Sequence, residues 1–169
     1  MEFEKVIKER YSCRKFLETP VEEDKLMAIL EAGRLAPTAK NRQPFKIYVL
    51  NRDTALKKVD RISPCRYSSQ CVLMVVEVKD EAFVRNDGTN FAEIDASIVT
   101  THMMLEATNV GLSSVWVGLL DEEAAKVEFH LPENYHPMGL LVLGYPDPSF
   151  KPSPMHSTRK KLEDIIVNY

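Results

Sequence analysis

Glycine-rich phosphate loops are absent from this sequence. Its six glycines form neither GxGxxG nor GxxxxGK[S/T], which excludes the phosphate-binding turns of the Rossmann fold and of the P-loop proteins. The four histidines lie far apart without HxxxH spacing, and the three cysteines form no CxxC pair, so no metal site is expected. A bound phosphate would therefore have to be held by side chains.

The sequence also has little excess charge and no long hydrophobic run. A formal net charge of −3 and a pI near 5.8 do not favour nucleic acid as a partner. No apolar run approaches the roughly 18 residues of a membrane helix, and the first residues, MEFEK, are charged, unlike a signal peptide. An odd number of cysteines argues against a disulfide framework. We therefore expect a cytoplasmic protein without membrane partners.

Apolar periodicity and turn residues predict one domain over residues 1–169, because no repeat or linker divides the chain. A capping box at Thr19–Glu22 is expected to open the second helix, and a polar helix or strand is expected over 159–169. The order of elements indicates an α+β or α/β layered domain with about four strands. Helices are expected at about 2–10, 19–36, 53–59, 92–110 and 121–129, and strands at 45–50, 72–78, 113–118 and 138–144.

A first candidate site follows the first predicted helix. Arg10, Ser12 and Arg14 alternate, so in an extended segment they would project to one side, while Tyr11 and Cys13 face the other. Two guanidinium groups and a hydroxyl are suited to phosphate oxygens. Taken alone, the same segment could be a solvated basic stretch.

A second candidate is the polar segment Ala36–Pro44, in which two prolines restrict the backbone and Thr38, Asn41 and Gln43 offer donors and acceptors. Taken alone, this segment could be an ordinary loop between a helix and a strand. Elsewhere the sequence shows no GxSxG elbow, no histidine partner for Cys13 and no pair of carboxylates on one helix face. No catalytic side chain is therefore expected.

Taken together and in order, the two segments resemble the start of the nitroreductase family of flavin-dependent oxidoreductases. Sequences of that family begin approximately with Arg-x-Ser-x-Arg/Lys, followed by Ala-Pro-Ser-x-x-Asn-x-Gln-Pro. This chain matches both motifs, with Thr38 in place of the serine of the second. The resemblance covers essentially the whole chain. It continues through Glu93–Ile98, Gly111–Leu112, Trp116–Gly118, Leu143–Pro146 and Arg159–Glu163.

The resemblance implies a layered α+β fold with a mainly antiparallel four-stranded sheet flanked by helices. It also implies an intertwined homodimer with FMN at the interface. By position, the FMN phosphate and ribityl chain would be held by Arg10, Ser12 and Arg14, with Arg159 as a further cation.

Two further groups of residues are carried over by the same resemblance. The flavin of the partner subunit would be reached by Pro37, Thr38, Ala39 and Asn41, and the backbone amides around Val117 and Gly118 would approach the isoalloxazine N5. Arg66, in the poorly aligned 62–69 loop, is a candidate for the pyrimidine end of the flavin. Because the chain is short for the family, a more open pocket is expected.

The implied activity is that of an FMN-dependent NAD(P)H oxidoreductase with ping-pong hydride transfer to an electron-poor acceptor, such as a nitroaromatic, a quinone or a flavin. Either NADH or NADPH is the expected electron donor. A flavoenzyme of the same fold with a different reaction, such as a dehalogenase, a dehydrogenase or a flavin-modifying enzyme, is an alternative. A flavin-binding protein without turnover is another.

Overall fold

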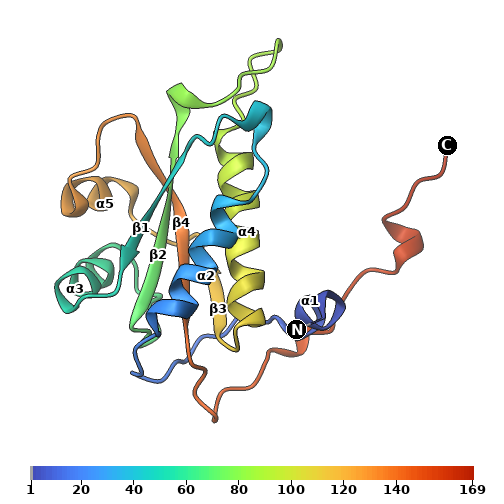
Figure 1. Ribbon diagram of the computed structural model, residues 1–169. Helices are drawn as coiled ribbons and strands as arrows, with labels where there is room; N and C mark the ends of the chain where they lie inside the picture. Colours follow the sequence, from blue (N-terminus) through green and yellow to red (C-terminus); the bar gives the residue numbers. More distant parts are fainter. Residues whose placement is uncertain (1) are drawn as a thin grey trace.

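The computed structural model describes residues 2–169, so Met1, where the predicted domain begins, lies outside the described residues. A four-stranded antiparallel sheet with strand order β1-β2-β4-β3 forms the central layer, and helices cover both of its faces (Figure 1). This arrangement confirms the predicted α+β architecture. The strands are β1 (Phe45–Leu50), β2 (Cys71–Val78), β3 (Ser113–Val117) and β4 (Tyr135–Gly144), and the helices are α1 (Phe3–Glu9), α2 (Glu23–Arg34), α3 (Asp53–Ile62), α4 (Ala92–Asn109) and α5 (Glu122–Phe129).

The sheet separates two hydrophobic layers. Every residue of β2 is buried, because β2 is a central strand with helices on both of its sides. Its side chains alternate: Val72, Met74 and Val76 pack in the layer formed with α3 and α5, whereas Leu73 and Val75 pack in the layer formed with α2 and α4. Burial on both faces explains the continuous apolar run that the sequence shows here.

Two predicted helix ends agree with the structure. The Asp121 side chain accepts a hydrogen bond from the Ala124 backbone nitrogen at 2.9 Å, so Asp121 is the N-cap of α5. Gly111 follows α4 with φ of +84°, a conformation that favours glycine, and its nitrogen donates to the Thr108 carbonyl at 3.1 Å.

The predicted capping box at Thr19–Glu22 is wrong. Helix α2 begins at Glu23, and Glu22 is its N-cap without a side-chain capping bond. The Glu22 carboxylate instead accepts from the Tyr145 hydroxyl, which lies 2.7 Å from Oε1 and 2.8 Å from Oε2. A tertiary contact with the turn after β4 therefore takes the place of the local cap.

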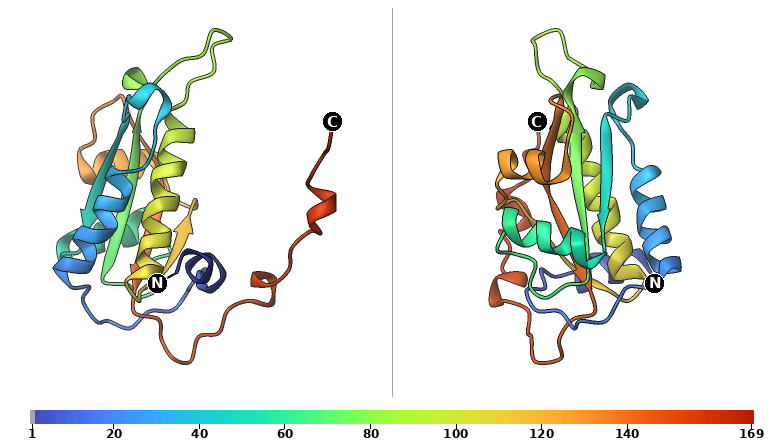
Figure 2. Two further views of the ribbon diagram at one scale, coloured as in Figure 1. Left: turned by 45° about the vertical axis from the view of Figure 1, so that its right-hand side comes forward. Right: turned by 90° about the vertical axis from the view of Figure 1, so that its left-hand side faces the viewer.

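The C-terminal segment after β4 runs away from the sheet, passes α1 and ends far from the sheet and its covering helices (Figures 1 and 2). The helix or strand expected over 159–169 is wrong, since the segment has only the 3₁₀ turns η3 (Pro154–His156) and η4 (Leu162–Asp164). Four apolar side chains near its end are exposed: Leu162, Ile165, Ile166 and Val167.

Within residues 2–169, no helix combines the length and the apolar character needed to cross a membrane.

Candidate functional site

A cavity of about 210 Å³ lies between the segment that follows α1 and the C-terminal segment. It brings together all four side chains predicted to contact a phosphate, although Arg159 is far from the other three in the sequence. The lining residues are Arg10, Tyr11, Ser12, Arg14, Ser153, Met155, His156 and Arg159.

The edge strand β3 positions the segment that carries the first three of these side chains. Ser12 forms a parallel bridge with Ser114, and the Cys13 nitrogen donates to the Ser114 carbonyl at 3.0 Å. The Cys13 side chain is completely buried in the layer of α3 and α5. Arg10 and Arg14 are therefore held on an extended segment by a backbone pairing and a buried anchor.

The expected alternation of this segment is confirmed, because Tyr11 packs against the same layer of α3 and α5 that buries Cys13, although Tyr11 also lines the cavity. The Tyr11 ring stacks on Phe150, with centroids 6.2 Å apart, and meets His156 edge-on at 6.3 Å. The C-terminal segment thus supplies aromatic partners at the cavity wall, which sequence reasoning did not anticipate.

The cavity is electrostatically positive. None of the eight lining residues is acidic, and among residues 2–169 no salt bridge neutralises Arg10, Arg14 or Arg159. Burial, and secondly the nearby positive charge of Arg159, lower the pKa of Arg10. Guanidinium groups that repel one another in a small cavity are stabilised by an anion, so the donor set fits a phosphate.

The Cys13 thiol is not a nucleophile in this arrangement. Its Sγ donates to the Lys15 carbonyl at 3.1 Å, and burial raises the pKa of the thiol despite its basic neighbours. The structure therefore agrees with a packing role for Cys13.

The second candidate segment lies at the opposite end of α2 and α4 from the cavity (Figures 1 and 2). Of the residues expected to reach a flavin there, Pro37 and Asn41 are exposed, and Thr38 and Ala39 are half-buried. One chain therefore does not bring its two candidate segments together.

Side-chain contacts and an unusual backbone give the second segment a fixed shape. Lys40, Asn41 and Gln43 all have positive φ, between 52° and 55°, in the left-handed region that is costly for residues other than glycine. The Thr38 Oγ1 accepts from the Gln43 nitrogen at 3.0 Å. Such conformations persist where surrounding contacts impose them, and they cluster at functional sites.

Asp95 of α4 helps to hold the second candidate segment in place, a role that the sequence analysis did not predict. Its side chain is 1% exposed, and its Oδ1 accepts from the Ala39 nitrogen at 2.9 Å, which ties the second segment to α4. The signal in the sequence was an acidic residue on the buried face of the longest helix, the opposite face from Glu93. The predicted separation of the Asp95 and Glu93 carboxylates is confirmed.

Val117 and Gly118 lie at the end of β3, the edge strand that also holds Ser12. Val117 is buried and Gly118 is exposed. Among the described residues, no atom lies within 4 Å of a Cβ built on Gly118, so packing within the chain does not require glycine there. A close approach of a ligand to the backbone remains a reason for glycine at this position.

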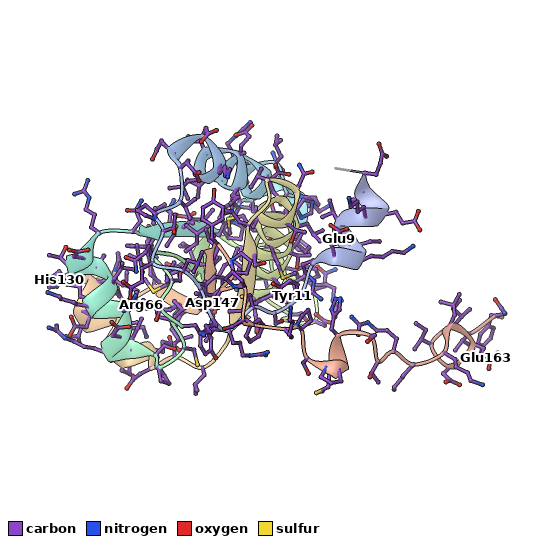
Figure 3. The ribbon with its side chains drawn as sticks, turned by 90° about the horizontal axis from the view of Figure 1, so that it is seen from below. Glu9, Tyr11, Arg66, His130, Asp147 and Glu163 are labelled. Carbon is purple, nitrogen blue, oxygen red and sulfur yellow. The ribbon has the colours of Figure 1, made fainter. Side chains whose placement is uncertain are left out.

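Arg66 does not line the cavity with the other arginines. Its guanidinium binds the Asp60 carboxylate at 2.6 and 2.9 Å and donates to the Ser69 carbonyl at 2.8 Å. It belongs to a separate cavity of about 180 Å³ beside α3, and Figure 3 shows Arg66 well apart from Tyr11. The contacts of Arg66 account for a structural role in the 63–69 turn.

The fold and the cavity together define an α+β protein with an arginine-lined cavity beside an edge strand. The sequence matches the profile of the nitroreductase family over residues 7–69 and 62–145. The chain therefore belongs to the nitroreductase family.

Solved structures and curated proteins agree with this assignment. A nitroreductase family protein of Clostridium difficile 630 has 37% identity and a TM-score of 0.92, and the match covers 99% of this chain and 98% of that one. A protein of Methanothermobacter thermautotrophicus, provisionally named NADH dehydrogenase/NAD(P)H nitroreductase, is 27% identical over 86% of this chain and 78% of its own length.

A third relative was solved with a ligand. The structure of a provisionally named nitroreductase of Exiguobacterium sibiricum, in complex with FMN, has a TM-score of 0.86 and covers 100% of this chain and 98% of that one. At 18% identity, this likeness shows the fold alone.

Proposed function

We propose that this protein is an FMN-dependent NAD(P)H oxidoreductase that reduces an electron-poor small molecule such as a nitroaromatic, a quinone or a flavin. The observation that carries the proposal is the cavity in which Arg10, Ser12, Arg14 and Arg159 converge without an acidic neighbour. The phosphate of FMN has nearly two negative charges at neutral pH and matches this set of donors. The E. sibiricum protein, which shares the fold of this chain, was solved in complex with FMN.

In this proposal the protein binds and orients a flavin rather than supplying an acid, a base or a nucleophile. The three arginines and Ser12 hold the phosphate end, and the backbone of Val117 and Gly118 lies along the same edge strand. When bound, FMN supplies the hydride chemistry, taking a hydride from NADH or NADPH and giving it to the acceptor in a ping-pong sequence.

A homodimer is the second part of the proposal. Pro37, Thr38, Ala39 and Asn41 lie at the far end of the molecule from their own chain's cavity, so they would reach the flavin of a partner subunit. The outer face of α4 supports such an interface, because an apolar hollow of about 420 Å³ runs along it between Glu93 and His102. The exposed apolar side chains of the C-terminal segment provide further surface for a partner.

The test is the visible spectrum of the purified protein. We expect a yellow protein with bound flavin that loses its colour when NADH or NADPH is added without oxygen. A colourless protein that also fails to bind added FMN would contradict the proposal.

The same experiment separates the alternatives. Flavin that binds but is reduced by neither nicotinamide would favour a flavin-binding protein without turnover. Flavin that is reduced but passes its electrons to no nitroaromatic, quinone or flavin would favour a flavoenzyme of the same fold with another reaction.

A further inference from the structure

His156 lines the arginine cavity, although no motif in the sequence singles it out. It belongs to η3 and is half-buried, with its ring edge-on to Tyr11. Its Nε2 lies 3.2 Å from the carbonyl oxygen of Lys8 in α1. Because a carbonyl oxygen can only accept, Nε2 carries a hydrogen, and Nδ1 is the nitrogen that can gain or lose a proton.

The side chains that surround His156 in the cavity are basic or neutral. No acidic side chain lines the cavity, and Glu4 and Glu9 of α1 are paired with Lys8 and Lys5. A phosphate in this cavity would balance the arginine charges, and an imidazolium at His156 would give it one more charged donor. The charged and titratable groups around His156 are Lys8 from α1, Arg10, Tyr11 and Arg14 from the segment after it, and Arg159 from its own segment.

We propose that His156, in its imidazolium form, is a further ligand of the FMN phosphate and makes flavin retention depend on pH. This inference rests on the proposed function. Imidazole is the side chain whose ordinary charge change falls between pH 5 and 8, so the contact strengthens as pH falls through that range. A charge-assisted hydrogen bond to phosphate is also about twice as strong as a neutral one.

The FMN phosphate itself titrates near pH 6. A change of FMN affinity with pH in a single protein would therefore not identify the contribution of His156. The informative quantity is the ratio of dissociation constants of His156→Gln and the unaltered protein, because titration of the free ligand affects both equally. Glutamine can still donate to the Lys8 carbonyl but cannot become charged.

The experiment measures FMN and riboflavin binding to the flavin-free protein by fluorescence quenching, at about pH 6 and about pH 8.5. At the lower pH we expect His156→Gln to bind FMN about 10 times more weakly than the unaltered protein. At the higher pH the two dissociation constants are expected to agree within about twofold. Riboflavin has no phosphate, so its ratio is expected to stay near one at both values. The His156→Arg variant has a permanent positive charge at this position and is expected to bind FMN tightly at both pH values.

His130→Asn is the matched control, because His130 caps α5 on the far side of the molecule from Tyr11 (Figure 3). The role of His156 would be overturned if the ratio of FMN dissociation constants were the same at both pH values. It would also be overturned if His156→Gln lost as much affinity for riboflavin as for FMN. His156→Arg keeps the test decisive if His156→Gln fails to fold, since weak FMN binding by a folded His156→Arg would also overturn it. If the unaltered protein binds no FMN at all, the proposed function fails instead.

Discussion

At the scale of single residues, the arginine cavity shows how charge is concentrated without a glycine-rich loop. Burial, and secondly the nearby charge of Arg159, lower the pKa of Arg10, so a bound anion would stabilise its charged form. Ser12 and Cys13 are held by Ser114 of β3, so the guanidinium groups start from a fixed backbone. Preorganised charges lose less entropy when the ligand binds.

Arg14→Ala is expected to weaken FMN binding by about tenfold or more, because one charge-assisted contact to the phosphate is lost. Riboflavin binding is expected to change by less than about twofold. Titration of both flavins, monitored by fluorescence, checks this. Arg61→Ala is the control, since Arg61 forms an exposed pair with Glu128 away from the cavity. Unchanged FMN binding by Arg14→Ala would show that the phosphate lies elsewhere.

The three cysteines are expected to differ in reactivity. Burial raises the pKa of Cys13 and raises that of Cys71 to about 12, so near pH 7.5 both are thiols without access to reagent, whereas Cys65 is half-buried. Peptide mapping by mass spectrometry after brief treatment with iodoacetamide should find label on Cys65 first. All three should react in urea. Labelling of native Cys13 as fast as Cys65 would contradict the packing role of Cys13.

At the scale of elements, α4 joins the sheet to the second candidate segment. Its buried face packs under the sheet, while Asp95 holds the second segment and the outer face forms the apolar hollow. The positive φ values of Lys40, Asn41 and Gln43 are sustained by contacts such as the one from Ala39 to Asp95. The shape of this loop therefore depends on a helix more than 50 residues later in the chain.

Asp95→Ala is expected to reduce the free energy of unfolding by about 1–3 kcal/mol, because the Ala39 N–H loses its acceptor. Asp95→Asn keeps an acceptor oxygen, so its free energy of unfolding is expected to fall by less than that of Asp95→Ala. Urea unfolding followed by circular dichroism measures both variants. Glu123→Ala, an exposed change on α5 outside the hollow of α4, is expected to stay within about 0.5 kcal/mol. Equal stability of all three variants would show that Asp95 does not hold the loop.

At the scale of the whole molecule, the two ends of one chain carry the two halves of a proposed flavin site. The arginine cavity is beside α1 and the C-terminal segment, and the Pro37–Pro44 segment lies at the other end of α2 and α4. The apolar hollow on α4 and the exposed end of the chain lie outside the two packed layers of the monomer. A second copy would cover these surfaces and complete the site.

Ile94→Asp is expected to convert a dimer to a monomer and to release flavin, because it places a charge in the apolar hollow of α4, where Ile94 is 45% exposed. Val127→Asp is the matched control, since Val127 is 73% exposed on α5, across the sheet from α4. Light scattering after gel filtration gives the mass, and the visible spectrum gives the flavin content. A dimeric Ile94→Asp variant with full flavin would contradict the shared site.

The sequence by itself determined the strands, most helices and the identity of the arginine segment, because these depend on local periodicity, on caps such as Asp121 and on motif spacing. Only the tertiary structure decided that His156 returns to the cavity and that Tyr11 lines it, whereas Arg159 was already expected there from the family resemblance. It also decided that Glu22 binds Tyr145 instead of capping α2, and that Asp95 holds Ala39. The physical reason is that these contacts join residues distant in the sequence, and no local pattern encodes which side chains meet when the chain folds back on itself.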